Sequence, residues 1–122
     1  MLSQRLAYQQ NSVTTAPPEK LVLMLYDGAL RFIAEGKGAI ERGELSRANA
    51  SLGNAQKILN ELRIGLNLQA GEIAGNLERL YEYINYRLIQ ANIKKDPQIL
   101  TEVAELLSEI RAAWAQGVCR VK

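Results

Sequence analysis

Along two long segments of this chain, an apolar residue recurs every three or four positions without a break. The spacing of three and four places these residues on one face of an α-helix, whereas a half-buried strand would alternate apolar and polar residues in steps of two. No segment of the chain alternates in that way, and the sequence therefore predicts an all-α fold. The two stripes are Leu45, Ala48, Leu52, Ala55, Leu59, Leu62 and Leu66, and then Ile73, Leu77, Leu80, Ile84, Leu88 and Ala91.

Proline, glycine and aspartate mark where two further helices begin and end. Proline is tolerated at the first position of a helix, so the first helix is expected to begin at Pro18. It should run to about Arg42, with Gly43 as its stop. Asp96 followed by Pro97 is typical of an N-cap and a first helical residue, and predicts the start of a fourth helix. The apolar stripe of that helix, which should end near Gly117, is Ile99, Val103, Leu107, Ile110 and Trp114.

Four amphipathic helices of similar length with short connections favour an antiparallel up-down four-helix bundle. The chain of 122 residues is long enough for one domain with a single core. We expect an extended N-terminal arm over residues 1–16, the bundle over 17–118 and a short C-terminal tail over 119–122. Interior glycines in the first helix, such as Gly36, suggest a close approach of a second helix. The predicted core includes Leu25, Leu52, Leu59, Leu80, Ile84, Leu107, Ile110 and Trp114.

The composition argues against several classes of function. The chain has no histidine, the commonest general base and metal ligand, so neither catalysis nor a metal or cofactor site is expected. Its net charge is +2 with basic and acidic residues interspersed, unlike the clustered basic face of a nucleic-acid-binding protein. The longest apolar run, Leu21 to Tyr26, is far shorter than the roughly 20 residues of a membrane span. A single cysteine, Cys119, is compatible with the reducing cytoplasm.

Two of the predicted helices carry more apolar residues than one core stripe needs. In the first helix Leu21, Leu25, Ala29 and Phe32 are assigned to the core, whereas Leu23, Tyr26, Leu30 and Ala34 follow the same spacing on another side. In the third helix Tyr86, Ile89 and Ile93 form a second line beside the core stripe. Such a surplus arises either from a helix that contacts two neighbours in the bundle or from a groove that receives an amphipathic partner helix. Tyr81 is assigned to the core, and Tyr83 and Tyr86 are placed nearer the outside.

Several motifs resemble the flagellin export chaperone family, FliS. The arm pairs Tyr8 with a Val-x-Thr-Ala-x-Pro element at residues 13–18, and Leu-Tyr-Asp-Gly-Ala follows at 25–29. A second match begins at Gly71-Glu72-Ile73-Ala74 and continues through Tyr83. A third consists of Gln-Ala-Asn at 90–92, with Leu-Leu at 106–107 and Ala-Trp at 113–114. The resemblance covers nearly the whole chain in order, which makes it more specific than any one motif.

This resemblance implies a cytoplasmic chaperone that binds the disordered C-terminal region of flagellin. It would prevent premature polymerisation and keep flagellin competent for flagellar type III secretion, with an export-gate component or a co-chaperone as a further partner. Nucleic acid, membrane insertion, metal and cofactor are not expected. A generic helical adaptor or regulatory bundle is the alternative, followed by a bundle enzyme. The residues expected to bind flagellin are Tyr8 on the arm, together with Leu23, Tyr26, Leu30, Tyr86, Ile89 and Ile93.

Overall fold

A computed structural model describes residues 18–66 and 71–117 of the chain, and every regular element in these two ranges is an α-helix. The helices are α2 (Pro18–Glu41), α3 (Leu45–Ile64), α4 (Glu72–Lys94) and α5 (Pro97–Ala115). The all-α prediction is confirmed, and the helix boundaries agree with it to within about two residues. The expected N-terminal arm over 1–16, with Tyr8, and the tail over 119–122 lie outside the described residues.

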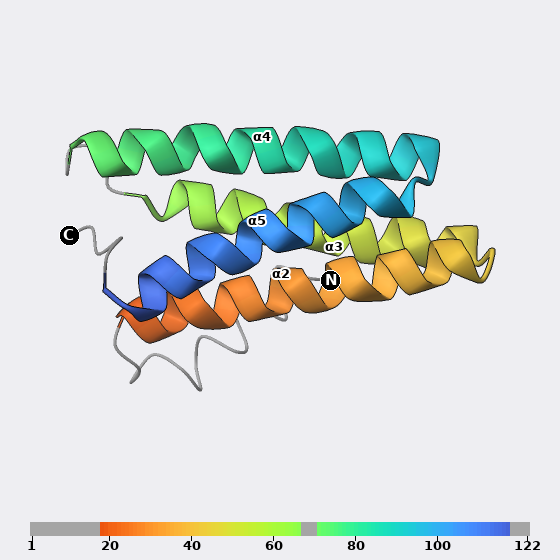
Figure 1. Cartoon of the computed structure of the whole chain (residues 1–122), viewed down its shortest axis with the longest axis horizontal. Coiled ribbons are helices and arrows are strands. Elements are labelled where there is room, and N and C mark those ends of the chain that lie inside the picture. Colours follow the sequence, from red (N-terminus) through yellow and green to blue (C-terminus); the bar gives the residue numbers. More distant parts are fainter. Residues whose placement is uncertain (1–17, 67–70, 118–122) are drawn as a thin grey trace.

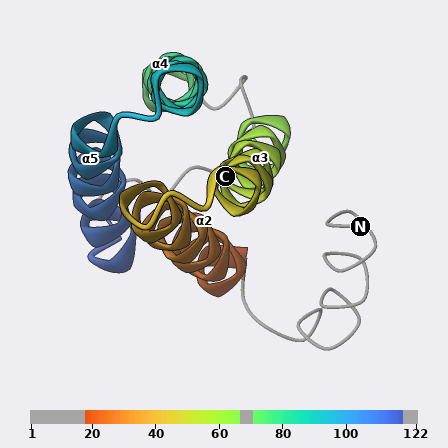
Figure 2. The same cartoon turned by 90° about the vertical axis from the view of Figure 1, so that its right-hand side faces the viewer.

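The four helices form an elongated bundle in which consecutive helices run in opposite directions (Figure 1). Helix α2 packs against α3 and α5, and α4 packs against the same two helices from the other side. Seen along its length, the bundle therefore places α2 and α4 at diagonally opposite corners (Figure 2). The predicted four-helix bundle is confirmed, and this diagonal arrangement determines which surfaces of the two helices can face one partner.

The helix ends from which the sequence analysis predicted two boundaries, at Gly43 and at Asp96–Pro97, are found in the structure. Gly43 has a φ of 74°, a left-handed conformation that glycine adopts without steric cost and that ends α2. At the start of α5, the Asp96 side chain accepts a hydrogen bond of 2.9 Å from the Gln98 backbone N–H, with Pro97 as the first helical residue. The turns are therefore specified locally, which explains why the sequence alone located them.

The core lies between the four helices and is almost entirely apolar. Six of the predicted core residues are buried, whereas Leu25 and Leu80 are partly buried and pack against the core. The six buried residues are Leu52, Leu59, Ile84, Leu107, Ile110 and Trp114.

Gly36 is the position where α2 and α3 approach most tightly around a missing side chain. A Cβ added at Gly36 would lie 2.6 Å from Cδ2 of the fully buried Leu52. The interior glycine that weakens α2 as an isolated helix thus makes room for a core leucine of the neighbouring helix. The predicted close approach is confirmed at this residue.

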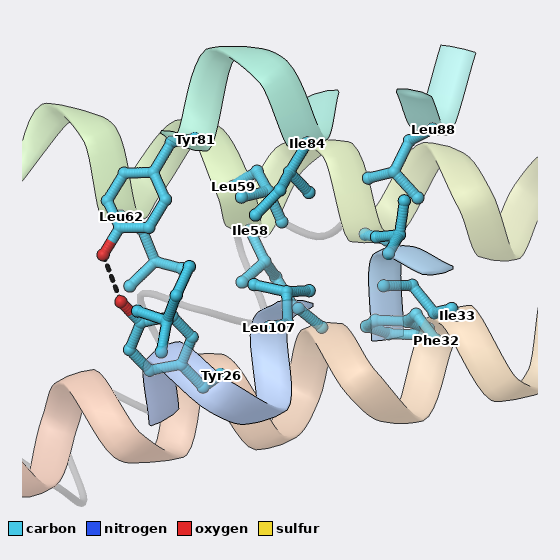
Figure 3. Close-up of a cluster of buried hydrophobic side chains, with 14 of the residues drawn as sticks. Tyr26, Phe32, Ile33, Ile58, Leu59, Leu62, Tyr81, Ile84, Leu88 and Leu107 are labelled. Atoms are coloured by element: carbon cyan, nitrogen blue, oxygen red, sulfur yellow. Dashed lines mark hydrogen bonds between the residues drawn. The ribbon is translucent and has the colours of Figure 1, made fainter. Parts of the chain in front are cut away.

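One pair of tyrosines crosses the core on the diagonal. The hydroxyl groups of Tyr26 on α2 and Tyr81 on α4 are hydrogen-bonded to each other, and both residues are buried (Figure 3). Their ring centroids are 6.3 Å apart. A buried hydroxyl needs a hydrogen-bond partner, and here each tyrosine supplies one for the other. This contact links two helices that lie diagonally opposite each other in the bundle.

Candidate functional site

Within the described residues, no group of three or more histidine, cysteine, aspartate or glutamate side chains could hold a metal ion. A search for helices of membrane-spanning length and apolarity over the same residues gives none. Two surface features contain residues that were predicted to bind a partner. They are an exposed apolar stripe on α4 and a groove between α2 and α5.

The exposed stripe on α4 consists of Tyr86, Ile89 and Ile93, and we call it the α4 stripe. These side chains are 56%, 39% and 78% exposed. Their spacing of three and four residues places them in one row along the helix, on the side away from the buried row that includes Ile84 and Leu88. The prediction that this second line lies outside the core is confirmed. A row of large apolar side chains in water is the kind of surface that a partner covers.

The groove between α2 and α5, called the α2–α5 groove below, includes the predicted site residue Leu30. It is open to solvent and has a volume of about 510 Å³. Its lining residues are Leu30, Ile33, Ala34 and Lys37 from α2, and Leu100, Thr101, Ala104, Glu105, Ser108 and Glu109 from α5. Leu23, the other outer residue predicted on α2, is partly buried and packs against the core rather than lining this groove.

The position predicted for Tyr26 is wrong. Sequence spacing grouped Tyr26 with Leu23 and Leu30 on an outer face, but its side chain is 0% exposed. Helix α2 packs on two neighbours, so its buried sector is wide, and the Tyr26 ring extends through that sector to Tyr81 on the opposite helix. Of the two explanations for the surplus apolar residues, contact with two neighbouring helices rather than a partner groove is therefore correct for Tyr26.

The structure also separates the two predicted lines of binding residues. Leu30 lies at the corner of α2 and α5, whereas the α4 stripe lies on the helix diagonally opposite α2 (Figure 2). A single straight groove lined by both sets of residues is absent from the part of the bundle that the structure describes. A partner that contacts both surfaces has to pass around the bundle.

Helix α5 lies between these two surfaces, and polar side-chain contacts connect it to α4 on one side and to α2 on the other. On the α4 side, Glu102 accepts hydrogen bonds from the Tyr83 hydroxyl at 2.9 Å and from the Arg87 guanidinium at 2.8 Å. The hydrogen bond from Arg87, followed by the one from Tyr83, lowers the pKa of the Glu102 carboxyl below its ordinary value. On the α2 side, the Arg111 guanidinium donates to both carboxylate oxygens of Asp27, at 2.5 and 3.2 Å.

Sequence reasoning missed the α5 side of the groove. The sequence analysis assigned no residue of α5 to a partner site, because periodicity identifies only the apolar stripe of each helix.

A third surface is a smaller cleft between α3 and α4, of about 240 Å³. Its lining is mostly polar and includes Asn60, Arg63, Glu82 and Asn85. The lining already contains internal contacts, since Arg63 donates to the Asn60 side chain at 3.1 Å and lies 3.9 Å from Glu82. None of the predicted site residues lines this cleft.

Comparison with known proteins gives one consistent family. The family described as Flagellar protein FliS matches residues 1–121. The flagellar secretion chaperone FliS of Bacillus subtilis (strain 168) is 45% identical over 112 residues, which is 92% of this chain and 84% of the relative. The proteins of the same name from Vibrio cholerae and Salmonella typhimurium are 39% identical over 115 and 109 residues. These alignments cover 90% and 88% of this chain, and 85% and 81% of the relatives.

Proposed function

The chain belongs to the FliS family, and we propose that it is a cytoplasmic export chaperone for flagellin. In this proposal it binds the disordered C-terminal region of flagellin, prevents premature polymerisation, and keeps flagellin competent for flagellar type III secretion. The relatives are named as chaperones rather than enzymes, and binding alone is sufficient for these tasks.

The observation that carries the proposal is the α4 stripe. Three large apolar side chains of one helix are exposed in a single row, and none of them belongs to the core cluster. An amphipathic segment that covers this row would remove its apolar surface from water, which is the main favourable term in most protein association. A segment held in this way has its own apolar face occupied and cannot use it to pair with other flagellin subunits.

A disordered segment of a partner can contact both the α4 stripe and the α2–α5 groove, although the two surfaces lie apart on the bundle. About ten residues of extended chain reach about 33 Å, enough to pass around one side of a four-helix bundle. A segment that orders on binding can follow such a path and cover a large surface, although the ordering reduces its affinity. We therefore propose that flagellin contacts the bundle at both surfaces, with Leu30 in the groove and Tyr86, Ile89 and Ile93 on the stripe.

A polymerisation assay tests this function. Flagellin monomers seeded with filament fragments should elongate normally alone and stop elongating when an equimolar amount of this protein is present. A chaperone that acts by one-to-one binding should suppress elongation in proportion to its concentration. Undiminished elongation at a severalfold excess of the protein would contradict the proposal and favour the alternative, a helical adaptor for another amphipathic segment.

A further inference from the structure

Two exposed tyrosines of α4, Tyr83 and Tyr86, use their hydroxyl groups in opposite ways. The Tyr83 hydroxyl donates its hydrogen to the Glu102 carboxylate of α5 at 2.9 Å. An ionised carboxylate only accepts, so this hydrogen is used inside the protein. The Tyr86 hydroxyl oxygen lies 3.0 Å from the side-chain nitrogen of Gln90, one turn later on the same helix. An amide nitrogen only donates, so the Tyr86 oxygen is an acceptor.

The orientation of the Gln90 amide follows from its contact with Arg87. One terminal nitrogen of Arg87 donates to the Gln90 side-chain oxygen at 2.7 Å, and the other donates to Glu102 at 2.8 Å. A guanidinium has no acceptor, so the amide oxygen of Gln90 has to face it, and the amide nitrogen therefore has to face Tyr86. The reversed amide would place N–H groups of both residues against each other. This chain of hydrogen bonds therefore has one direction, which is fixed by the charged pair at its start.

One donor is left at the end of this chain. Tyr86 accepts from Gln90, and no residue within 18–66 or 71–117 accepts the hydrogen of its hydroxyl group. That hydrogen cannot point at Gln90, whose N–H group faces the same oxygen. The Tyr86 side chain is 56% exposed and is the first residue of the α4 stripe. The stripe therefore combines an apolar row with one hydrogen-bond donor that is oriented before any partner binds.

We propose that Tyr86 is a specificity-determining residue of the α4 stripe, and that its hydroxyl donates a hydrogen bond to an acceptor oxygen of the bound segment. Gln90 is the positioning residue, because it holds the Tyr86 oxygen as an acceptor and leaves the hydrogen for the partner. Since this arrangement exists before binding, less rotational freedom is lost when the partner arrives. The inference rests on the proposed function, because the bound segment is taken to be the C-terminal region of flagellin.

The first test, Tyr86→Phe, removes the donor and keeps the aromatic ring. Affinity for a peptide of the C-terminal region of flagellin from the same bacterium should fall about threefold to tenfold if the acceptor is a neutral carbonyl. It should fall more than about tenfold if the acceptor is a carboxylate. Tyr83→Phe is the matched control on the same helix. The hydrogen of Tyr83 is held by Glu102, so the affinity of this variant should be nearly unchanged.

The second test, Gln90→Glu, alters the positioning residue and leaves every atom of Tyr86 in place. The new carboxylate accepts from Arg87 as the amide does, but it has no N–H group, so the Tyr86 hydroxyl has to donate to it and is lost to the partner. A circular-dichroism melting curve should show a bundle at least as stable, because the carboxylate faces a guanidinium. Affinity should nevertheless fall as far as in Tyr86→Phe, and the two changes together should weaken binding no further than either one. Gln56→Glu on α3 makes the same change in charge and should bind normally.

The possible results separate this inference from the proposed function. If the unmodified protein binds the peptide and either Tyr86→Phe or Gln90→Glu binds it equally well, the inference is overturned and the proposed function stands. Independent losses that add in the double variant, or equal losses in Tyr83→Phe or Gln56→Glu, also overturn it. If the unmodified protein does not bind the peptide, both fall. Selective and non-additive loss in the two variants, with stability retained, supports the inference.

Discussion

Replacing Leu59 by alanine is expected to lower the free energy of unfolding by about 2–5 kcal/mol. Leu59 lies on α3 with only 1% of its surface exposed, in the same cluster as Tyr81 and Ile84 of α4. Removing three carbon atoms there forfeits their burial and leaves a cavity that a close-packed bundle closes only in part. Urea-induced unfolding followed by circular dichroism measures the change.

Ile64→Ala is the matched control for this prediction. Ile64 is an aliphatic residue of the same helix, but 67% of its surface is exposed. Its truncation should change the free energy of unfolding by less than about 0.5 kcal/mol. If the two variants unfolded at the same urea concentration, the assignment of the α3 core face would be wrong.

Removing the α4 stripe is expected to produce the largest loss of flagellin binding. The triple variant Tyr86→Ala, Ile89→Ala and Ile93→Ala should reduce affinity about a hundredfold or more, because a few large side chains usually supply most of the binding energy. The bundle should remain folded, since all three side chains are exposed and lie outside the core cluster. Titration calorimetry with the flagellin C-terminal peptide measures the loss.

The control for the α4 stripe removes exposed aliphatic side chains from another helix. Leu45 and Ile64 of α3 are exposed to a similar degree, and the double alanine variant should bind flagellin with nearly unchanged affinity. Raising the salt concentration should weaken the complex only modestly, because burial of apolar surface is expected to dominate the binding energy. An affinity that collapsed between low and moderate salt would indicate a mainly electrostatic site.

The helices of this fold could be predicted because their signals are local. The spacing of apolar residues predicted most of the buried faces of α3, α4 and α5, although Leu45 and Ile73, the first residues of two predicted stripes, are exposed. The Asp96–Pro97 and Gly43 positions predicted helix ends that the structure confirms. The position of Tyr26 could not be predicted in the same way. Its burial depends on Tyr81, which is 55 residues away in the sequence and on the helix across the diagonal.

The same limit applies to the candidate site. Sequence spacing identified the exposed α4 stripe correctly, because the side of a helix opposite its core face follows from its own periodicity. It assigned Leu30 and that stripe to one flagellin groove, although the two lie on different sides of the bundle. The α2–α5 groove depends on which helices become neighbours, and the Asp27–Arg111 ion pair, which also joins α2 to α5, links residues 84 positions apart. Periodicity within one helix contains no information about such contacts.

Calorimetric titration of the unmodified protein with the flagellin C-terminal region tests the central claim most directly. The account predicts saturable binding of one segment per chain, with a negative heat-capacity change from apolar burial and new helical signal as the segment orders. A segment of equal length from another part of flagellin serves as the control and should not bind. Absence of binding to the C-terminal region, or equal binding of both segments, would contradict the account.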